Sequence, residues 1–321
     1  MSFINLASAK LGAKALSCSD DSFASMDRLL QDHAPVWKED VYDDFGKWMD
    51  GWESKRRRSG GFDWCILELA VPGQIDHFIV DTSYFTGNYP PGAQIWGAAG
   101  EQPPSENSDQ WVALSDLLSL QGNDQQQAAC RDAQSTYRWL KFDIYPDGGV
   151  ARLRVMGKAV VEHQADQRTE LSALINGGHI TAYSDAHYGN VEAVLTHGRG
   201  QDMGDGWETK RRREPGHEWI IIELGVPGRV DEIEIDTAHF KGNFPGGVSV
   251  QAAHMPALGD RAIVTQAMFW PEILPVQPLE ADKIHRFKLH QPTAPITHIK
   301  VNNIPDGGMS RIRAFGFPDH G

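Results

Sequence analysis

The chain of 321 residues contains only three cysteines, Cys18, Cys65 and Cys130. The number is odd, and none of the three recurs at the matching position of the internal repeat described below. A disulfide framework would be expected in both copies of a repeat. We therefore interpret the cysteines as reduced thiols and expect a reducing compartment, the cytoplasm.

The sequence also lacks a long apolar segment. No apolar run approaches the roughly 20 residues that a membrane-spanning helix needs. The first ten residues lack the basic segment followed by a continuous apolar run that marks a secretory signal. These absences argue against secretion and against a membrane partner.

An excess of positive charge is missing too, since the formal net charge is −13. An acidic chain does not attract a polyanion over its whole surface, so a nucleic-acid partner is not expected. Metalloprotease, CxxC, P-loop, dinucleotide-binding and Gly-x-Ser-x-Gly motifs are absent. The sequence indicates no cofactor and no metal-ligand set, and it leaves a divalent metal open.

The chain contains two copies of one sequence unit. The segment Gly51-Trp52-Glu53-Ser54-Lys55-Arg56-Arg57-Arg58 returns at residues 206–213, with seven of eight residues identical and Thr in place of Ser. Self-similarity on this scale predicts two tandem domains, residues 1–165 and residues 166–321. Before the Trp-Glu segment the first copy is ten residues longer, around Gln31–Glu39, which is polar and predicted to be a surface loop.

Each copy reads as a series of short strands. Long segments of 3.6-residue periodicity are scarce, and Gly and Pro interrupt many β-branched and aromatic runs. This pattern predicts an all-β protein of two tandem jelly-roll β-sandwiches. Strands are expected at 62–69, 75–82 and 137–144 and at their counterparts 217–224, 230–237 and 296–303, with Val-Pro-Gly turns at 71–73 and 226–228.

The basic run behind Trp-Glu has three interpretations. It is a solvated basic edge, a binding site for a carboxylate, or a contact between domains or subunits. Arg offers planar two-point hydrogen bonding that suits carboxylates. The run occurs at the same position behind Trp-Glu in both copies of an acidic chain, which weakens the first interpretation. The sequence favours neither of the other two over the other.

Two further motifs are weighed in the same way. Asp81 and Asp236 end predicted strands, where they cap turns or line a pocket. The Phe-x-Gly-Asn loops that follow are expected to hold a left-handed, sharply turned backbone at Gly-Asn. His239 and Lys241 replace Tyr84 and Thr86 there, so the two loops differ chemically. The last strands carry Arg-x-Arg after Pro-Asp-Gly-Gly; these arginines bind a ligand or form the exposed face of an edge strand.

Together, these motifs resemble the allantoicase family. The resemblance rests on the twin Gly-Trp-Glu-[Ser/Thr]-Lys-Arg-Arg-Arg segments, the Val-Pro-Gly sequences, the Asp-Thr-x-x-Phe-x-Gly-Asn-aromatic-Pro loops and the Pro-Asp-Gly-Gly endings. It runs from about Asn5 to Phe317. It implies two jelly rolls of the galactose-binding type and a homo-oligomer. It also implies a small-molecule substrate, allantoate, hydrolysed to ureidoglycolate and urea in purine catabolism.

The chemistry of that substrate suggests roles for the repeated residues. Allantoate carries a carboxylate and two ureido groups on one carbon, so its hydrolysis calls for a cation, hydrogen-bonding groups and acid–base groups. We predict acid–base roles for Glu53 or Glu208 and Asp81 or Asp236, with His239 a further candidate. The predicted substrate-binding residues are Trp52, Lys55, Arg56, Asn88 and Arg152 in the first copy, and Trp207, Lys210, Arg211, Lys241, Asn243 and Arg311 in the second. Which copy serves stays open.

Two competing functions remain at this stage. Jelly rolls of this kind often bind carbohydrate or another ligand without catalysis, and a fold alone does not decide function. The paired motifs would also be explained by a purely structural contact between copies. The absence of a signal sequence and of an attached catalytic domain favours the enzyme.

Overall fold

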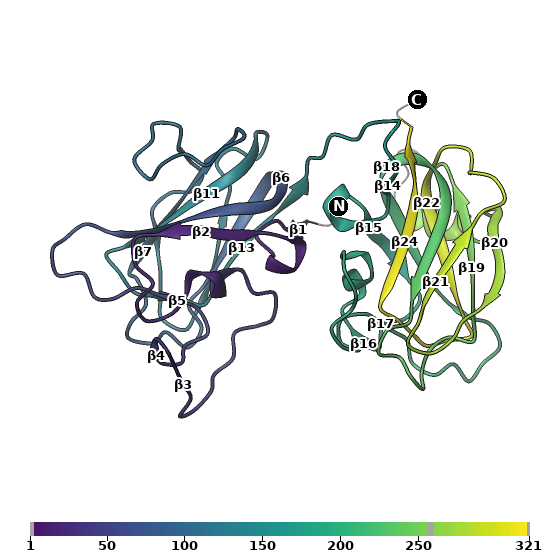
Figure 1. The fold of residues 1–321 in the computed structure, drawn as a ribbon, viewed down its shortest axis with the longest axis horizontal. Coiled ribbons are helices and arrows are strands. Elements are labelled where there is room, and N and C mark those ends of the chain that lie inside the picture. Colours follow the sequence, from purple (N-terminus) through teal and green to yellow (C-terminus); the bar gives the residue numbers. More distant parts are fainter. Residues whose placement is uncertain (1–2, 256–259, 320–321) are drawn as a thin grey trace. The chain divides into compact units, whose positions relative to one another are not determined.

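The computed structural model describes residues 3–255 and 260–319, which form two compact units, one ending at Val161 and the next beginning at Glu162 (Figure 1). The described elements are almost all strands, and each unit is a jelly-roll β-sandwich, as the sequence predicts. The division lies four residues before the predicted boundary at 165/166, within the polar run that the prediction chose.

The first unit contains strands β1 to β13 and two short 3-10 helices. Their bounds are β1 Ile4–Asn5, η1 Ala9–Leu11, β2 Lys14–Cys18, η2 Met26–Leu30, β3 Tyr42–Asp43, β4 Gly46–Lys47, β5 Trp52–Glu53, β6 Asp63–Asp81, β7 Gly92–Ala98, β8 Val112–Ala113, β9 Leu118–Ser119, β10 Gln125–Ala129, β11 Thr136–Tyr145, β12 Gly149–Val150 and β13 Arg152–Ala159.

The second unit repeats the plan and adds a short helix. Its elements are β14 Thr169–Glu170, η3 Leu174–Asn176, β15 His179–Tyr183, β16 Tyr188–Gly189, η4 Val191–Leu195, β17 Trp207–Glu208, β18 Glu218–Asp236, β19 Gly247–Ala253, α1 Asp260–Gln266, β20 Glu272–Pro278, β21 Ile284–Lys288, β22 Ile296–Ile304, β23 Gly308–Met309 and β24 Arg311–Pro318.

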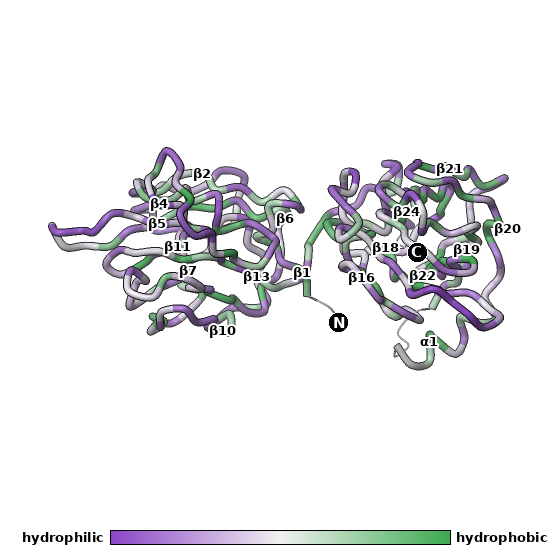
Figure 2. The backbone as a smooth tube through the Cα atoms, turned by 90° about the horizontal axis from the view of Figure 1, so that it is seen from below, coloured by the Kyte–Doolittle hydropathy of each residue, from purple (hydrophilic) through white to green (hydrophobic). Residues whose placement is uncertain are grey.

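One long strand organises each unit. The first half of β6 pairs with β2 and β11, and its second half pairs with β10 and β13. In the second unit β18 pairs first with β15 and β22 and then with β21 and β24. The apolar side chains between the sheets of each sandwich form its core, and the hydrophobic stretches follow the strands of both units (Figure 2).

The Val-Pro-Gly turns predicted from the sequence are wrong. Val71-Pro72-Gly73 lies inside β6 and Val226-Pro227-Gly228 inside β18, so each predicted pair of strands is one strand of 19 residues. The proline falls where the strand changes partners and the ladder is interrupted, so its missing N–H removes no regular pair. Gly73 is needed for space: a Cβ there would lie 2.5 Å from Leu6 Cδ1 and 2.7 Å from Lys158 O.

Three repeated motifs meet at one end of each sandwich. In the first unit β5 pairs with β12, so Glu53 lies opposite Gly149 of the Pro-Asp-Gly-Gly turn. The Gly149 N–H donates to Asn88 O at 2.7 Å, which attaches the Phe-x-Gly-Asn loop to the same turn. The predicted positive φ of the turn is confirmed at Gly148 (138°), whereas the left-handed residue of the loop is Tyr84 (69°), not Gly87 or Asn88.

A buried phenylalanine fills the space beneath this junction. Phe85 is fully buried, and a Cβ on Gly149 would lie 2.0 Å from two of its ring atoms. Phe240 and Gly308 repeat the contact at 2.0 Å in the second unit. The loop and the turn therefore fit together only when the turn residue has no side chain.

Substitution Gly149→Ala is expected to destabilise the protein by about 1–3 kcal/mol, because the added methyl group overpacks the site against Phe85. Denaturant unfolding of the variant measures the loss. Gly87→Ala is the matched control: its Cβ would meet nothing within 4 Å, so a change of less than about 0.5 kcal/mol is expected. Equal stability of Gly149→Ala and the wild type would contradict the packing argument.

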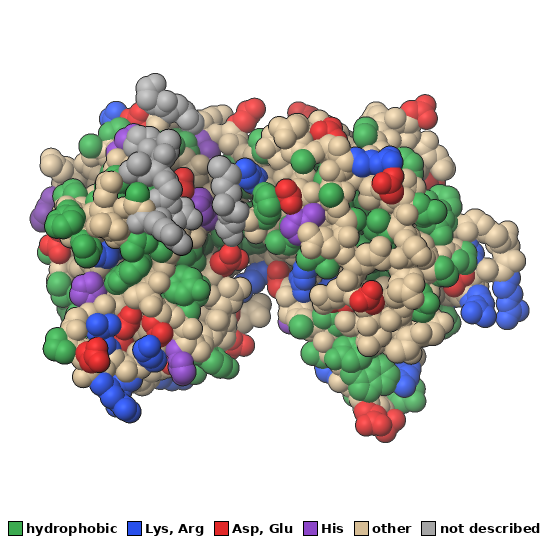
Figure 3. All heavy atoms as spheres, turned by 180° about the vertical axis from the view of Figure 1, so that it is seen from behind, with side chains coloured by type: hydrophobic (Ala, Val, Ile, Leu, Met, Phe, Trp, Pro, Cys, Tyr) green, Lys and Arg blue, Asp and Glu red, His purple; other side chains and the backbone are tan. Residues whose placement is uncertain are grey.

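The surface is mixed in charge. Among the described side chains on the face drawn in Figure 3, acidic and basic groups are interspersed rather than gathered into a continuous basic band. No helix in the described part of the chain is long and apolar enough to cross a membrane. All three cysteines are free thiols.

Candidate functional site

The junction of the three motifs in the first unit borders an open pocket of about 630 Å³. Its walls come from the segment after β5, the Gly-Asn loop and the Pro-Asp-Gly-Gly turn. The lining residues are Phe23, Glu53, Ser54, Arg56, Arg57, Gly87, Asn88, Tyr89, Pro91, Pro146, Asp147 and Gly148. Carboxylate, guanidinium and amide groups therefore face one space.

Of the Trp-Glu pair, the tryptophan lies in the core and the glutamate lies at the pocket. Trp52 is fully buried, and its ring N–H donates to Asp20 O at 2.8 Å. Because successive strand residues point to opposite faces, the neighbouring Glu53 is turned the other way and lines the pocket. Its backbone is held on both sides, by Gly149 in β12 and by the N–H and carbonyl of Ala24.

Glu53 is a carboxyl group in an environment that favours its protonated form. Burial raises the pKa of Glu53, and the hydrogen bond that Asn88 Nδ2 donates to its Oε1 at 2.6 Å opposes this only in part. A carboxyl group with a raised pKa retains its proton closer to neutral pH than an exposed glutamate does. Such a group can act as a general acid and, once deprotonated, as a general base.

Along the basic run, side chains that form an ion pair alternate with side chains that do not. Lys55 Nζ lies 3.0 Å from Asp20 Oδ2, and Arg57 NH1 lies 2.6 Å from the buried Asp63 Oδ1. Arg56, between them, lines the pocket and makes no hydrogen bond or ion pair with any residue that the structure describes. The predicted carboxylate-binding cation is therefore available at Arg56, whereas its neighbours are held by acidic partners.

The second unit repeats this arrangement. Asn243 Nδ2 donates to Glu208 Oε1, as Asn88 does to Glu53. Lys210 pairs with Asp185 at 3.4 Å, and Arg212 pairs with Glu218 at 2.8 Å. Arg211 corresponds to Arg56 and likewise has no polar partner within the described parts of the chain.

The two predicted strand-end aspartates serve the turns in which they lie. Asp81 is buried; its Oδ1 accepts from the Ser83 N–H at 2.8 Å and its Oδ2 from Gln125 Nε2 at 2.8 Å. Asp236 is equally buried and accepts from the Ala238 N–H at 2.8 Å. Neither lines the pocket of the first unit, and their catalytic role stays a prediction.

The first arginines of the last strands are in the interior. Arg152 is 0% exposed and donates to Asp50 Oδ2 at 2.7 Å, as well as to the carbonyls of Asp50, Ala151, Arg28 and His33. Arg311 is 1% exposed and donates to Asp205 Oδ2 at 3.0 Å. The expectation of an exposed strand face is wrong for these two arginines, because both are buried. These guanidinium groups already face carboxylate and carbonyl oxygens, which leaves them out of the pocket.

The other predicted site residues of the second unit are Trp207, the acid–base candidate His239 and Lys241. Trp207, like Trp52, is fully buried and donates its ring N–H to the carbonyl of Asp185, at 2.7 Å. His239 has a φ of 70° and its Nε2 lies 2.7 Å from Gly200 O, while Lys241 is exposed and has no hydrogen bond or ion pair among the described side chains. The structure brings together Glu53, Asn88 and Arg56 at one pocket, and places Trp52 in the core of the same unit.

Sequence reasoning missed the residues that anchor the site. Asp20 accepts from the Lys55 N–H at 2.7 Å, and Asp185 does the same for Lys210 at 2.8 Å. Ser54 Oγ accepts from the Gly148 N–H at 3.2 Å. Their signal was present: Ser-Asp at 19–20 recurs at 184–185, and the Ser/Thr exchange in the Trp-Glu segment keeps the hydroxyl. Within the described residues, no three His, Cys, Asp or Glu side chains are grouped so as to hold a metal ion.

Comparison with known proteins places this geometry in context. The family model described as Allantoicase repeat matches residues 4–160 and again residues 169–319. A Burkholderia mallei protein named probable allantoicase 1 is 46% identical over 321 residues, covering 99% of this chain and 95% of its own length. A probable allantoicase from Photobacterium profundum is 46% identical, covering 98% of this chain and 96% of its own. The crystal structure of allantoicase from Saccharomyces cerevisiae is similar with a TM-score of 0.81 at 32% identity, over 98% of this chain and 93% of that one.

Proposed function

This chain belongs to the allantoicase family, and on that basis we propose that it hydrolyses allantoate to ureidoglycolate and urea, with the pocket of Glu53, Asn88 and Arg56 as the reaction site. It is a hydrolase of C–N bonds in linear amidines, acting on a small molecule. The observation that carries the choice of pocket is the half-buried Glu53 beside the guanidinium of Arg56, which has no polar partner in the described structure. A non-catalytic ligand-binding protein is not favoured, because the relatives that match nearly the whole chain are named as enzymes.

Each group in the pocket has a role in this proposal. Arg56 binds the substrate carboxylate through two parallel N–H donors. Asn88 uses its amide to orient a ureido group. Protonated Glu53 gives its proton to the departing ureido nitrogen, the C–N bond breaks, and urea leaves. The carboxylate so formed accepts a proton from water while the water oxygen bonds to the same carbon, which completes the hydrolysis.

The assay for this proposal is urea release from allantoate by the purified protein, run with and without a chelator. Urea formed in stoichiometric amount with ureidoglycolate is the expected result. The chelator arm decides whether a divalent metal takes part. A protein that folds and releases no urea in either arm, with or without added divalent cations, would remove the proposed activity.

Substitution Arg56→Gln is expected to raise KM for allantoate about 10- to 100-fold, the value of one lost charge-assisted interaction. The change in kcat should be smaller, because the carboxylate is bound before and during the reaction. Steady-state kinetics at constant ionic strength separates the two parameters.

Arg58→Gln is the matched control for this prediction. Arg58 belongs to the same run, is exposed and has no polar partner in the described structure, but it does not line the pocket. Its KM should stay within about twofold of the wild type. Equal effects of the two substitutions would mean that the run acts through general charge and not through Arg56.

We also propose that the protein works in the cytoplasm as a homo-oligomer without a nucleic-acid or membrane partner. The free thiols support the cytoplasm, and the acidic net charge supports the lack of a nucleic-acid partner. The homo-oligomer rests on the resemblance to the family. Light scattering of the purified protein measures the oligomer, and a monomer at assay concentration would contradict it.

A further inference from the structure

Away from the Glu–Asn–Arg pocket, the second unit has a hollow on one face of its sheet. The strands beneath it are β18, β22 and β19, which lie side by side. Its volume is about 620 Å³, and Trp219, Lys300, Asn302, Ser249, Gln251 and Met268 are among the residues that line it. Arg212 of the basic run and Glu272 also line the hollow. The Arg212 guanidinium is held by Glu218 at 2.8 Å.

Lys300 is the unusual group in this hollow. Its side chain lies in β22 with 8% of the residue exposed, and its Nζ lies 5.9 Å from the centre of the Trp219 ring. It makes no hydrogen bond or ion pair with any residue in the described ranges. Burial without a counter-charge lowers the pKa of the Lys300 ammonium. A buried lysine in this position gains from an anion close to its ammonium group.

The first unit shows what the missing partner is. Lys141 occupies the position that corresponds to Lys300, and its Nζ lies 3.4 Å from Asp143 Oδ2. The residue that corresponds to Asp143 is Asn302, two positions after Lys300. The second copy therefore has the lysine without the internal carboxylate. The aromatic contact differs as well: Lys141 Nζ lies 5.2 Å from the centre of the Trp96 ring, whereas Lys300 lies over Trp219.

The amide of Asn302 cannot replace that carboxylate. Gln251 Nε2 donates to Trp270 O at 2.8 Å, so the Gln251 Oε1 is left as an acceptor. Asn302 Nδ2 donates to this oxygen at 3.2 Å and to Ser249 Oγ at 3.0 Å. The Asn302 Oδ1 is buried and has no hydrogen-bond partner within the described structure. The amide orientation is thus fixed, and it brings no negative charge to Lys300.

We propose that the hollow over β18, β22 and β19 of the second unit binds a small free carboxylate, which pairs with Lys300 beside the Trp219 ring. The bound carboxylate takes the place that Asp143 holds in the first unit. The site is specific to the second repeat and separate from the pocket of Glu53.

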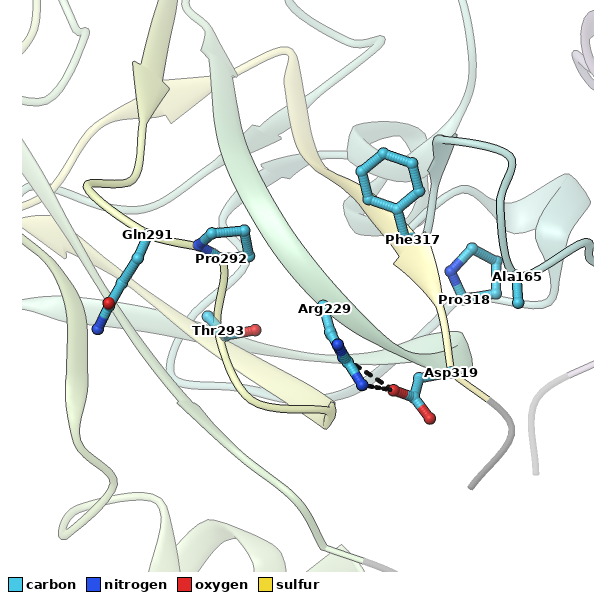
Figure 4. Close-up of a pocket in the computed structure, with 8 residues that line it drawn as sticks. All are labelled: Ala165, Arg229, Gln291, Pro292, Thr293, Phe317, Pro318 and Asp319. Carbon is cyan, nitrogen blue, oxygen red and sulfur yellow. Dashed lines mark hydrogen bonds and ion pairs between the residues drawn. The ribbon is translucent and has the colours of Figure 1, made fainter.

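Another hollow of the same unit lacks this feature. It lies between Arg229 of β18, the loop at 291–293 and the end of β24 (Figure 4). Arg229 Nε donates to Asp319 Oδ2 at 2.8 Å, so the cation there already has its carboxylate. The contrast singles out Lys300 as the buried cation that a ligand would complete.

The test follows the methyl group of Met268, which lines the hollow, by NMR of the full chain labelled with 13C-methyl methionine. The Met268 signal is the one missing from Met268→Leu. Acetate is the probe, titrated at constant ionic strength against chloride. A saturable shift of this signal in the millimolar range is expected with acetate, and no saturation with chloride.

Asn302→Asp is the decisive variant, since it restores the Lys–Asp pair that the first unit tolerates. It should abolish the acetate response, and Lys300→Gln should do the same. Asp143→Asn is the matched control and should leave the Met268 response unchanged. Thermal melting confirms that each variant is folded, and an unfolded Asn302→Asp protein leaves Lys300→Gln to decide.

Two outcomes would overturn the proposal. One is the lack of a saturable acetate shift in the wild type, and the other is a wild-type response in folded Lys300→Gln. Urea release by Asn302→Asp should stay within about twofold of the wild type. The NMR result does not depend on catalysis, so failure of the proposed activity and failure of this site can be told apart.

Discussion

Replacing Glu53 by Gln is expected to lower kcat for urea release by roughly 10²- to 10⁴-fold, the usual contribution of a general acid–base group. The variant should keep the geometry, because a glutamine Oε1 can still accept from Asn88 Nδ2 as Glu53 does at 2.6 Å. KM should change little, since the carboxylate of the substrate is assigned to Arg56. Steady-state urea release over a range of pH measures both parameters.

The pH profile carries a second signature of Glu53. Burial raises the pKa of this group, so the limb that reports its ionisation should lie at higher pH than an ordinary glutamate would give. In Glu53→Gln that limb should disappear together with most of the rate. A residual activity with an unchanged pH profile would assign the limb to another residue.

Glu208→Gln is the matched control for Glu53→Gln, because Glu208 has the same position and the same asparagine partner in the second unit. If the first pocket carries the reaction, this variant should retain at least half of the wild-type kcat. A large loss in Glu208→Gln alone would move the reaction to the second unit. Small losses in both single variants and in the double variant would remove the glutamates from the mechanism.

Replacing Arg152 by Met is expected to destabilise the first unit by about 3–5 kcal/mol, because it leaves the buried Asp50 carboxylate without its counter-charge. The guanidinium also donates to four backbone carbonyls, and each of these would lose this hydrogen bond. Denaturant unfolding should show the loss as a lower transition midpoint, and at a temperature where the variant is folded its KM for allantoate should match the wild type.

Arg58→Met controls for the removal of a charge from the surface. It should change the free energy of unfolding by less than about 0.5 kcal/mol. A stable Arg152→Met protein with a raised KM would show instead that Arg152 contacts the substrate, as the sequence suggested. The two readouts therefore separate a binding arginine from one that holds the fold together.

The repeat and the fold class could be predicted because they depend on features written along the chain. The Trp-Glu segment occurs twice in the same order relative to the other motifs, and strand-forming runs dominate both copies. The same local signals misplaced the Val-Pro-Gly sequences. Pro and Gly are typical of turns, but here each lies within a strand that passes from one pair of partners to another. That change of partners is set by distant strands and has no local signature.

The candidate site could be predicted in part for a similar reason. Glu53, Asn88 and Arg56 are among the site residues that the repeated motifs indicated, and these three line one pocket, whereas Asp81 and Arg152 do not. Which arginine lines the pocket without a polar partner could not be read from four adjacent basic residues. It depends on Asp20 and Asp63, which take Lys55 and Arg57 and are distant from each other in sequence. The burial of Arg152 likewise depends on Asp50, 102 residues earlier.

The alternation of paired and unpaired side chains in the basic run has a consequence for conformational entropy. The Lys55 and Arg57 backbone N–H groups donate to Asp20 and Asp147, so the peptide that carries Arg56 is fixed at both ends before any ligand arrives. Ordering a free loop residue would cost about 1–2 kcal/mol for the backbone alone. Here only the rotamers of one side chain remain to be ordered, so most of the attraction between guanidinium and carboxylate is left to stabilise the complex.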